Sequence, residues 1–221
     1  MLSAHLDPTP PASGQSPHQF PQVSSRDPRH SVRSAHRPAA GWGPLEDAGA
    51  SPQLVRPVYY WISAQAEPMI ADFCREFLFA RLASARAGVD LREVTDWLNR
   101  KGCDWSPLVA TKVGRGLLAA LRDFGILEGR SKKHVSTLRL QIGSFAYLAF
   151  CWNQLGSLGR NLVFHRDWEL FLLQVSEVEH YFLEAHQHRL LEYHAAGSTI
   201  SISFPCQTME EYAHFVVDRS N

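Results

Sequence analysis

Two helices joined by a very short link are the feature that most restricts how this chain can fold. Within "VDLREV", Asp90 can cap a helix and Glu93 stands three residues later, which is a capping box. We expect that helix to end just before Gly102, a residue suited to the left-handed conformation that commonly follows a helix. The link "GCDW" (102–105) then leads directly to Ser106, the predicted N-cap of the next helix. A link this short predicts a helix-turn-helix.

Two short strands are predicted after the second of these helices. The helix is expected over residues 106–124, with Pro107 in its first turn. An apolar pair at 126–127 and an alternating run at 135–140 predict the strands, and the basic stretch "RSKKH" lies between them. A further helix is expected upstream, at 68–87. This order of helix, helix, tight turn, helix and two strands predicts a central winged helix-turn-helix.

The rest of the chain is arranged around this predicted domain, to which we assign residues 57–142. Residues 1–53 hold nine of the thirteen prolines, so we expect a disordered tail, with a solvated linker, a DNA-contacting tail and translated upstream sequence as alternatives. Residues 143–221 predict a helical region with a helix capped at Ser176 and a β-hairpin within 190–204, a possible second winged-helix-like unit. The expected fold class is α+β and mostly α.

Charge is separated along the chain although its total is zero. Residues 106–140 contain seven Lys or Arg against two acids, a net charge of +5. Residues 141–221 contain four Arg against nine acids, a net charge of −5. Nucleic acid attracts only the first of these segments. The acidic half suits a protein partner, or limits unspecific binding to DNA.

Nine residues of the predicted helix and wing are candidates for DNA contact. Side chains near the start of the helix are placed to reach base edges or adjacent phosphates, and those of the wing would hold the backbone. The candidates are Thr111, Lys112, Arg115, Arg122, Arg130, Lys132, Lys133, His134 and Arg139. Gly114 and Gly116 in the same helix allow two explanations, close helix packing or close approach of a phosphate.

The segment "VATKVGRGLLAALRDFGILEG" (109–129) resembles the winged-helix segment of the BrxA-like family, small components of BREX phage-defence systems. In that family a helix rich in Lys and Arg, followed by Gly and an aliphatic pair, precedes the wing. The resemblance implies a mostly helical protein that binds duplex DNA and has no enzymatic activity of its own. By position it implies that Lys112 and Arg115 face the DNA.

Signals for other chemistry are weak. His180, His186, His188 and His194 lie close in sequence, but their spacing fits no familiar zinc site, so we expect no metal and no cofactor. The chain has no GxSxG, Walker or strand-linked GxGxxG motif, and we expect no enzyme. The four cysteines form no CxxC pair, and neither a secretory signal nor a membrane-spanning run is evident. We therefore expect a cytoplasmic protein that does not bind a membrane.

Two functions are compatible with these features. The first is a DNA-binding winged-helix protein, an accessory component of a phage-defence or related DNA-processing assembly with other protein partners. The alternative is a protein-binding adaptor or structural subunit that uses its acidic C-terminal half and does not bind DNA. Binding to duplex DNA that weakens steeply with salt distinguishes the first from the second.

Overall fold

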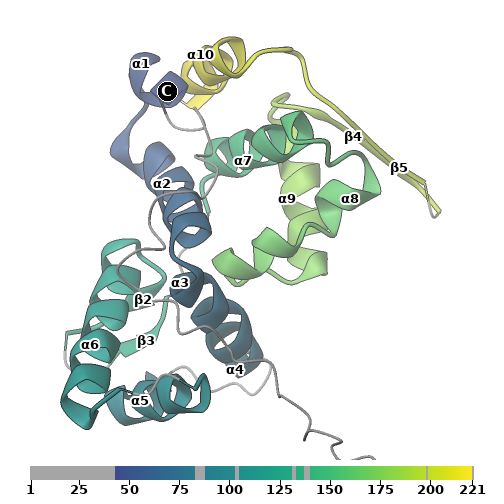
Figure 1. Ribbon diagram of the computed structural model, residues 1–221. Helices are drawn as coiled ribbons and strands as arrows, with labels where there is room; N and C mark the ends of the chain where they lie inside the picture. Colours follow the sequence, from purple (N-terminus) through teal and green to yellow (C-terminus); the bar gives the residue numbers. More distant parts are fainter. Residues whose placement is uncertain are drawn as a thin grey trace, which may run out of the picture. The chain divides into compact units, whose positions relative to one another are not determined.

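The computed structural model describes residues 43–82, 88–102, 105–130, 133–136, 140–197 and 199–220, all within one compact unit, Arg37–Asn221. These residues are mostly helical and include two small antiparallel sheets (Figure 1), which confirms the expected fold class. The elements are α1 (Gly43–Asp47), α2 (Pro52–Ala66), α3 (Pro68–Asp72), the π-helix η2 (Phe73–Phe79), α4 (Ala80–Leu82), β1 (Gly88–Val89), α5 (Leu91–Arg100), α6 (Pro107–Asp123), β2 (Leu127–Glu128), β3 (Lys133–Val135), α7 (Ile142–Gln154), α8 (Arg160–Val163), the 3-10 helix η3 (Arg166–Phe171), α9 (Val175–Gln187), β4 (Glu192–Ala196), β5 (Thr199–Ser203) and α10 (Met209–Ser220). Within the described residues, no helix has the length and apolar character needed to cross a membrane.

Helical structure begins earlier than the proline-rich composition indicates. The part of the expected tail up to residue 42 lies outside the described residues, but α1 and the start of α2 follow it directly. Pro52 occupies the first turn of α2, where the missing backbone N–H breaks no helical hydrogen bond. Leu45 and Leu54 are fully buried and anchor both helices in the core. Tertiary burial therefore outweighs local composition here.

The helix expected at 68–87 begins as predicted but is not a regular α-helix. α3 starts at Pro68, and the seven residues of η2 then form a π-helix before α4 resumes. The described helix ends at Leu82, and residues 83–87 lie outside the described part. Phe73 and Leu78 of η2 are fully buried, so the wider turns still present apolar side chains to the core.

The two helices predicted to form a helix-turn-helix begin at the predicted caps, and residues 103 and 104 of the link between them lie outside the described residues. Asp90 and Glu93 form the capping box of α5, and Gly102 has a φ of 74°. The Ser106 side chain accepts a hydrogen bond from the Val109 backbone N–H and caps α6. α6 then packs on α5; the expected starts of both helices are confirmed, and each helix ends one residue earlier than expected, at Arg100 and Asp123.

A three-stranded sheet, with its strands in the order β1-β3-β2, packs next to α6 and contacts it through β2. β3 lies between the other two strands and is antiparallel to both. The pairing of Val89 with Lys133 and of Leu127 with Val135 buries the three apolar side chains. Two differences from the sequence analysis follow: β1 was not predicted, and β3 begins at Lys133, a residue expected at the wing tip.

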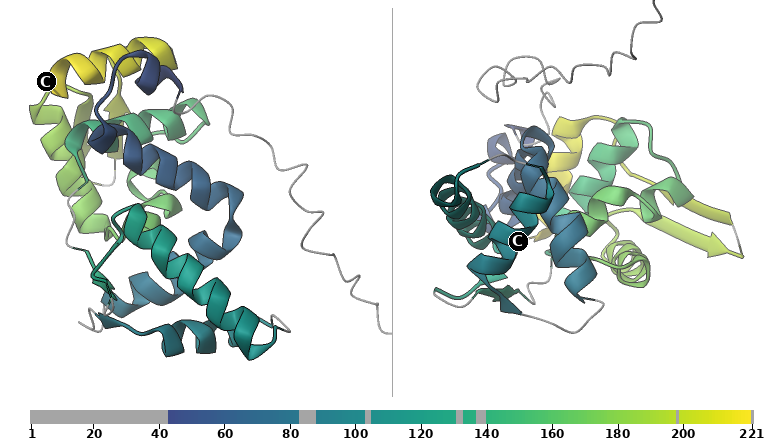
Figure 2. Two further views of the ribbon diagram at one scale, coloured as in Figure 1. Left: turned by 90° about the vertical axis from the view of Figure 1, so that its left-hand side faces the viewer. Right: turned by 60° about the horizontal axis from the view of Figure 1, so that its bottom comes forward.

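The C-terminal residues are organised around the almost completely buried helix α7. The Phe145 ring stacks on Trp168 from η3, and Gly143 lies so close to α10 that a Cβ there would be 2.7 Å from Ser220 Oγ. The β4–β5 hairpin is confirmed and extends away from the helices (Figures 1 and 2). The capping box of α9 is formed by Gln174 and Glu177, two positions before the expected one at Ser176. A second winged-helix-like unit stays a prediction.

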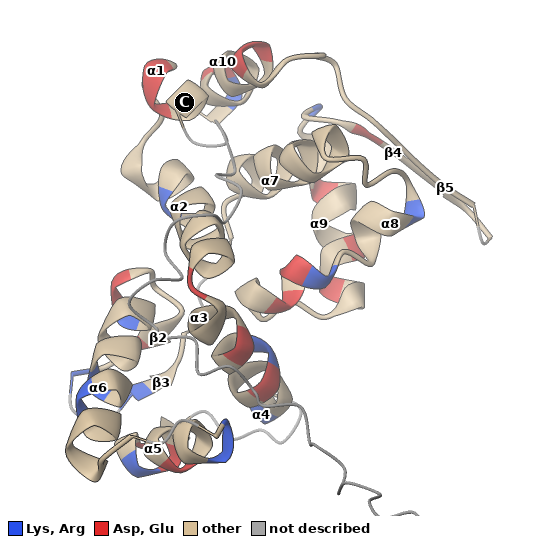
Figure 3. Cartoon of the chain, viewed as in Figure 1, with Lys and Arg blue, Asp and Glu red and all other residues tan. Residues whose placement is uncertain are grey.

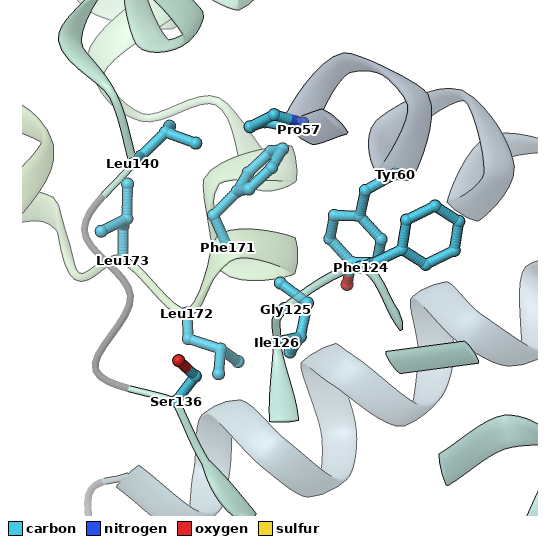
Figure 4. A pocket seen from close by; sticks show the side chains of 10 residues that line it. All are labelled: Pro57, Tyr60, Phe124, Gly125, Ile126, Ser136, Leu140, Phe171, Leu172 and Leu173. Carbon is cyan, nitrogen blue, oxygen red and sulfur yellow. The ribbon is translucent and has the colours of Figure 1, made fainter. Parts of the chain in front are cut away.

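The C-terminal residues contact the earlier helices at several places, among them Asp167 and an apolar cavity. Asp167 of η3 accepts hydrogen bonds from the Trp61 indole at 2.7 Å and from Gln65 at 2.8 Å, and it pairs with Arg75 of η2. Beside this cluster, a cavity of about 40 Å³ is enclosed mainly by apolar side chains (Figure 4). Its lining residues are Pro57, Tyr60, Phe124, Gly125, Ile126, Ser136, Leu140, Phe171, Leu172 and Leu173. The two halves of the sequence therefore share one core.

Candidate nucleic-acid interface

One exposed stripe of α6 carries most of the candidate residues of the helix. The opposite face is fixed by buried side chains that pack on α5 and the sheet, so the stripe points away from the core. At the i, i+4, i+7, i+11 and i+14 spacing of one helix face, the stripe consists of Leu108, Lys112, Arg115, Ala119 and Arg122. Lys112, Arg115 and Arg122 are all exposed. Figure 3 shows these cations along α6, with further ones beside β3.

An open pocket of about 320 Å³ forms where this stripe meets the β2–β3 loop. Four cationic side chains line it, two from the helix and two from the loop and β3, and no acid lines it among the described residues. Its lining residues are Val89, Leu91, Arg115, Leu118, Ala119, Arg122, Arg130 and Lys133. Cations separated by up to eighteen positions in the sequence are therefore brought together at one surface hollow. Such a cluster attracts a phosphate group.

Lys133 shapes the loop that forms one side of the pocket. Its ammonium group donates hydrogen bonds to the carbonyl oxygens of Gly129 at 2.7 Å and of Arg130 at 2.6 Å. The residue is only 9% exposed, an unusual burial for lysine. Gly129 has a φ of 93°, so the loop turns sharply at the point that Lys133 holds. The main effect of this lysine is to present Arg130 and to add positive charge behind it.

The remaining candidates have more varied surroundings. The Arg122 guanidinium is 2.6 Å from Asp123, an exposed pair that reduces its net charge. The Thr111 hydroxyl donates to the Pro107 carbonyl at 2.7 Å and is thus occupied within the helix. His134 is exposed, with its Nε2 atom 3.6 Å from Glu128. Lys132 and Arg139 lie outside the described residues.

The two glycines of α6 differ in their surroundings. A Cβ atom at Gly114 would lie 3.2 Å from Leu91 and 3.4 Å from Val94, so this glycine permits the close packing of α6 on α5. A Cβ atom at Gly116 would meet no atom within 4 Å among the described neighbours. Packing therefore explains Gly114 and does not explain Gly116, which lies beside the cationic stripe.

Several apolar residues of this surface were not among the candidates. Val89, in β1, and Leu91, the first residue of α5, line the pocket, and the two-residue strand β1 has no local sequence pattern. Leu108 begins the exposed stripe and is 80% exposed. Leu108 could have been recognised from the sequence, because the helical repeat places it on the same face as Lys112 and Arg115.

Among the described residues, no three His, Cys, Asp or Glu side chains lie close enough together to hold a metal ion. Of the clustered histidines, His186 and His194 have ring centres 5.6 Å apart, and the His186 Nδ1 atom accepts a hydrogen bond from the Tyr193 backbone. The His186 side chain thereby ties the start of β4 to the end of α9.

Comparison with known protein families identifies the segment that carries the pocket. Residues 46–150 match the BrxA family. The BrxA match runs from α1 into α7 and contains every residue that lines the basic pocket. It confirms the resemblance noted at 109–129 and extends it to both sides, while residues 151–221 lie outside it. No match was found among curated proteins or among solved structures.

Proposed function

We propose that the chain binds duplex DNA through a winged helix-turn-helix formed by α3–α4, β1, α5, α6, β2 and β3. The observation that carries this proposal is the convergence of Arg115, Arg122, Arg130 and Lys133 on one pocket. Arg122 is paired with Asp123, but the converging cations still create a positive potential that favours an anion. DNA supplies a regular row of such anions.

The order of the elements supports the same proposal. A winged helix-turn-helix has a helix, a short strand, two helices with a tight turn and a two-stranded wing, and its second helix of the turn enters the major groove. Arg130, after β2, and Lys133, at the start of β3, line the same pocket as the α6 residues Arg115 and Arg122, which supports this arrangement. α6 is then the recognition helix and the β2–β3 loop is the wing.

Each part of the surface has a separate task in this proposal. Arg115 and Arg130 hold phosphates at the pocket, where a guanidinium group can donate two parallel hydrogen bonds. Lys112, nearer the N-terminal end of α6, lies deeper in the groove, beside base edges. Gly116 lets the DNA backbone approach the helix closely. Phosphate contacts fix the register, and base contacts provide any sequence preference.

We further propose that the protein acts without catalysis of its own, as an accessory subunit of a BREX-type phage-defence assembly. The BrxA match supports this role. The net charge of −5 over residues 141–221 suits contact with other protein subunits and keeps that half away from DNA. The rival function, an adaptor that does not bind DNA, relies on the same acidic half.

Fluorescence anisotropy with a labelled duplex tests the proposal. Wild-type affinity should fall steeply with salt, and the variants Arg115→Glu and Arg130→Glu should each weaken binding about ten-fold or more at low salt. The slope of log affinity against log salt should become shallower by about one for each lost phosphate contact.

Arg166→Glu is the matched control, because it makes the same charge change at an exposed position of η3. It should bind DNA nearly as well as the wild type. If the Arg115 and Arg166 variants lose affinity equally, net charge and not the pocket governs binding. Absence of binding by the wild type at low salt would favour the adaptor.

A further inference from the structure

The first turn of α6 exposes two large apolar side chains. Leu108 is 80% exposed, more than any other large apolar residue in the described part of the chain, and its neighbour Val109 is 43% exposed. Folding of the helix does not require them, because Ser106 already caps it and Pro107 fills its first position. The exposed leucine and its exposed valine neighbour are therefore free to contact another molecule.

The surroundings of Leu108 indicate the kind of molecule that it meets. Leu108 shares its helix face with Lys112 and Arg115, so the apolar side chain continues the cationic stripe. The first turn of α6 contains no acid, which leaves the positive end of the helix dipole uncompensated. A partner that touches this stripe must be anionic and must also present an apolar group between its charges.

The major groove of DNA meets both requirements. Its walls carry phosphates, and the one apolar group on its floor is the C5-methyl group of a pyrimidine, present on thymine and on 5-methylcytosine and absent from uracil and cytosine. The N-terminal residues of a recognition helix are those that reach base edges. We propose that Leu108, with Val109 at its side, contacts the C5-methyl groups of 5-methylpyrimidines in the major groove. This inference rests on the proposed DNA binding.

Removal of the methyl group from the DNA tests the inference directly. The probe is a labelled duplex of alternating A·T and G·C pairs, made once with thymine and once with deoxyuridine in every thymine position. The wild type should bind the deoxyuridine duplex about three- to five-fold more weakly for each methyl group contacted. A third duplex, with deoxyuridine for thymine and 5-methylcytosine for cytosine, should restore affinity if any 5-methylpyrimidine is recognised, whereas recovery with thymine but not with 5-methylcytosine restricts recognition to the thymine methyl group.

Leu108→Ala should bind the thymine duplex more weakly and should no longer distinguish thymine from deoxyuridine. Its thermal unfolding should match the wild type, since the side chain is exposed. Leu155→Ala, at an apolar position that is 74% exposed after α7, is the matched control and should keep the full discrimination.

The outcomes separate this inference from the proposed function. Equal binding of the thymine and deoxyuridine duplexes by the wild type overturns methyl recognition and leaves DNA binding intact. Undiminished discrimination by Leu108→Ala overturns the role of Leu108. Failure of the wild type to bind either duplex at low salt overturns DNA binding, and the inference with it.

Discussion

Replacement of Asp167 by alanine should destabilise the whole protein, because this carboxylate joins η3 to two earlier helices. Its side chain is 13% exposed, and it accepts hydrogen bonds from Trp61, Gln65 and Arg75, the last with a side chain only 15% exposed. Removing the carboxylate leaves a largely buried guanidinium without its counter-charge and an indole N–H without its acceptor. Breaking one side of a buried pair in this way costs about 3–5 kcal/mol.

Urea unfolding followed by tryptophan fluorescence measures this cost. A loss of about 3–5 kcal/mol is a large part of the total stability of a domain of this size. The urea concentration at the unfolding midpoint should therefore fall clearly. Asp167→Asn keeps the shape and one acceptor oxygen and should lose less, about 1–3 kcal/mol. Glu169→Ala, on the same 3-10 helix with a carboxylate 4.0 Å from the exposed Arg166, should change stability by less than about 1 kcal/mol. The reasoning is refuted if the Asp167 and Glu169 alanine variants unfold at the same urea concentration.

Three further predictions concern single residues of the described structure. Gly116→Ala should stabilise α6 by about 0.5–1 kcal/mol, since a Cβ there meets open space, yet it should weaken DNA binding. The melting temperature should therefore rise while the DNA affinity measured by anisotropy falls. Burial raises the pKa of the Cys74 thiol to about 12 and also raises that of Cys151, so peptide mapping should find both unalkylated in the native protein at about pH 8 and modified after denaturation. Burial lowers the pKa of His165, whose ring stacks on Trp152, so the unfolded state takes up its proton first. Stability should therefore fall with pH below the ordinary value of 6.5, and His165→Gln should flatten the melting temperature between about pH 7 and pH 5.

Local signals in the sequence were sufficient to predict where α5 and α6 begin. The capping box at Asp90 and the cap at Ser106 fix the starts of α5 and α6 through hydrogen bonds within a few residues, so they can be recognised without knowledge of the rest of the chain. The β4–β5 hairpin is predictable for the same reason, since its two strands are adjacent in sequence.

Features that depend on distant contacts were not predictable in this way. β1 has two residues and exists because it pairs with β3, more than forty positions later, so no alternating pattern marks it. The apolar residues of η2 would also suit an α-helix, so its wider turns could not be recognised from the sequence. In the candidate interface, the burial of Lys133 depends on the carbonyl oxygens of its own loop, which a list of charges does not reveal.

The π-helix has a consequence for how far this segment can vary. Arg75 points to Asp167 on one side, while six positions later Arg81 donates to both carboxylate oxygens of Glu93 on α5, each at 2.9 Å. The angle around the helix axis between Arg75 and Arg81 is set by the number of residues per turn. This number is larger in η2 than in an α-helix. Deleting one residue of η2 would preserve its composition and its helical character, yet would rotate one arginine away from its carboxylate. The length of this segment is therefore more tightly constrained than the identity of its exposed side chains.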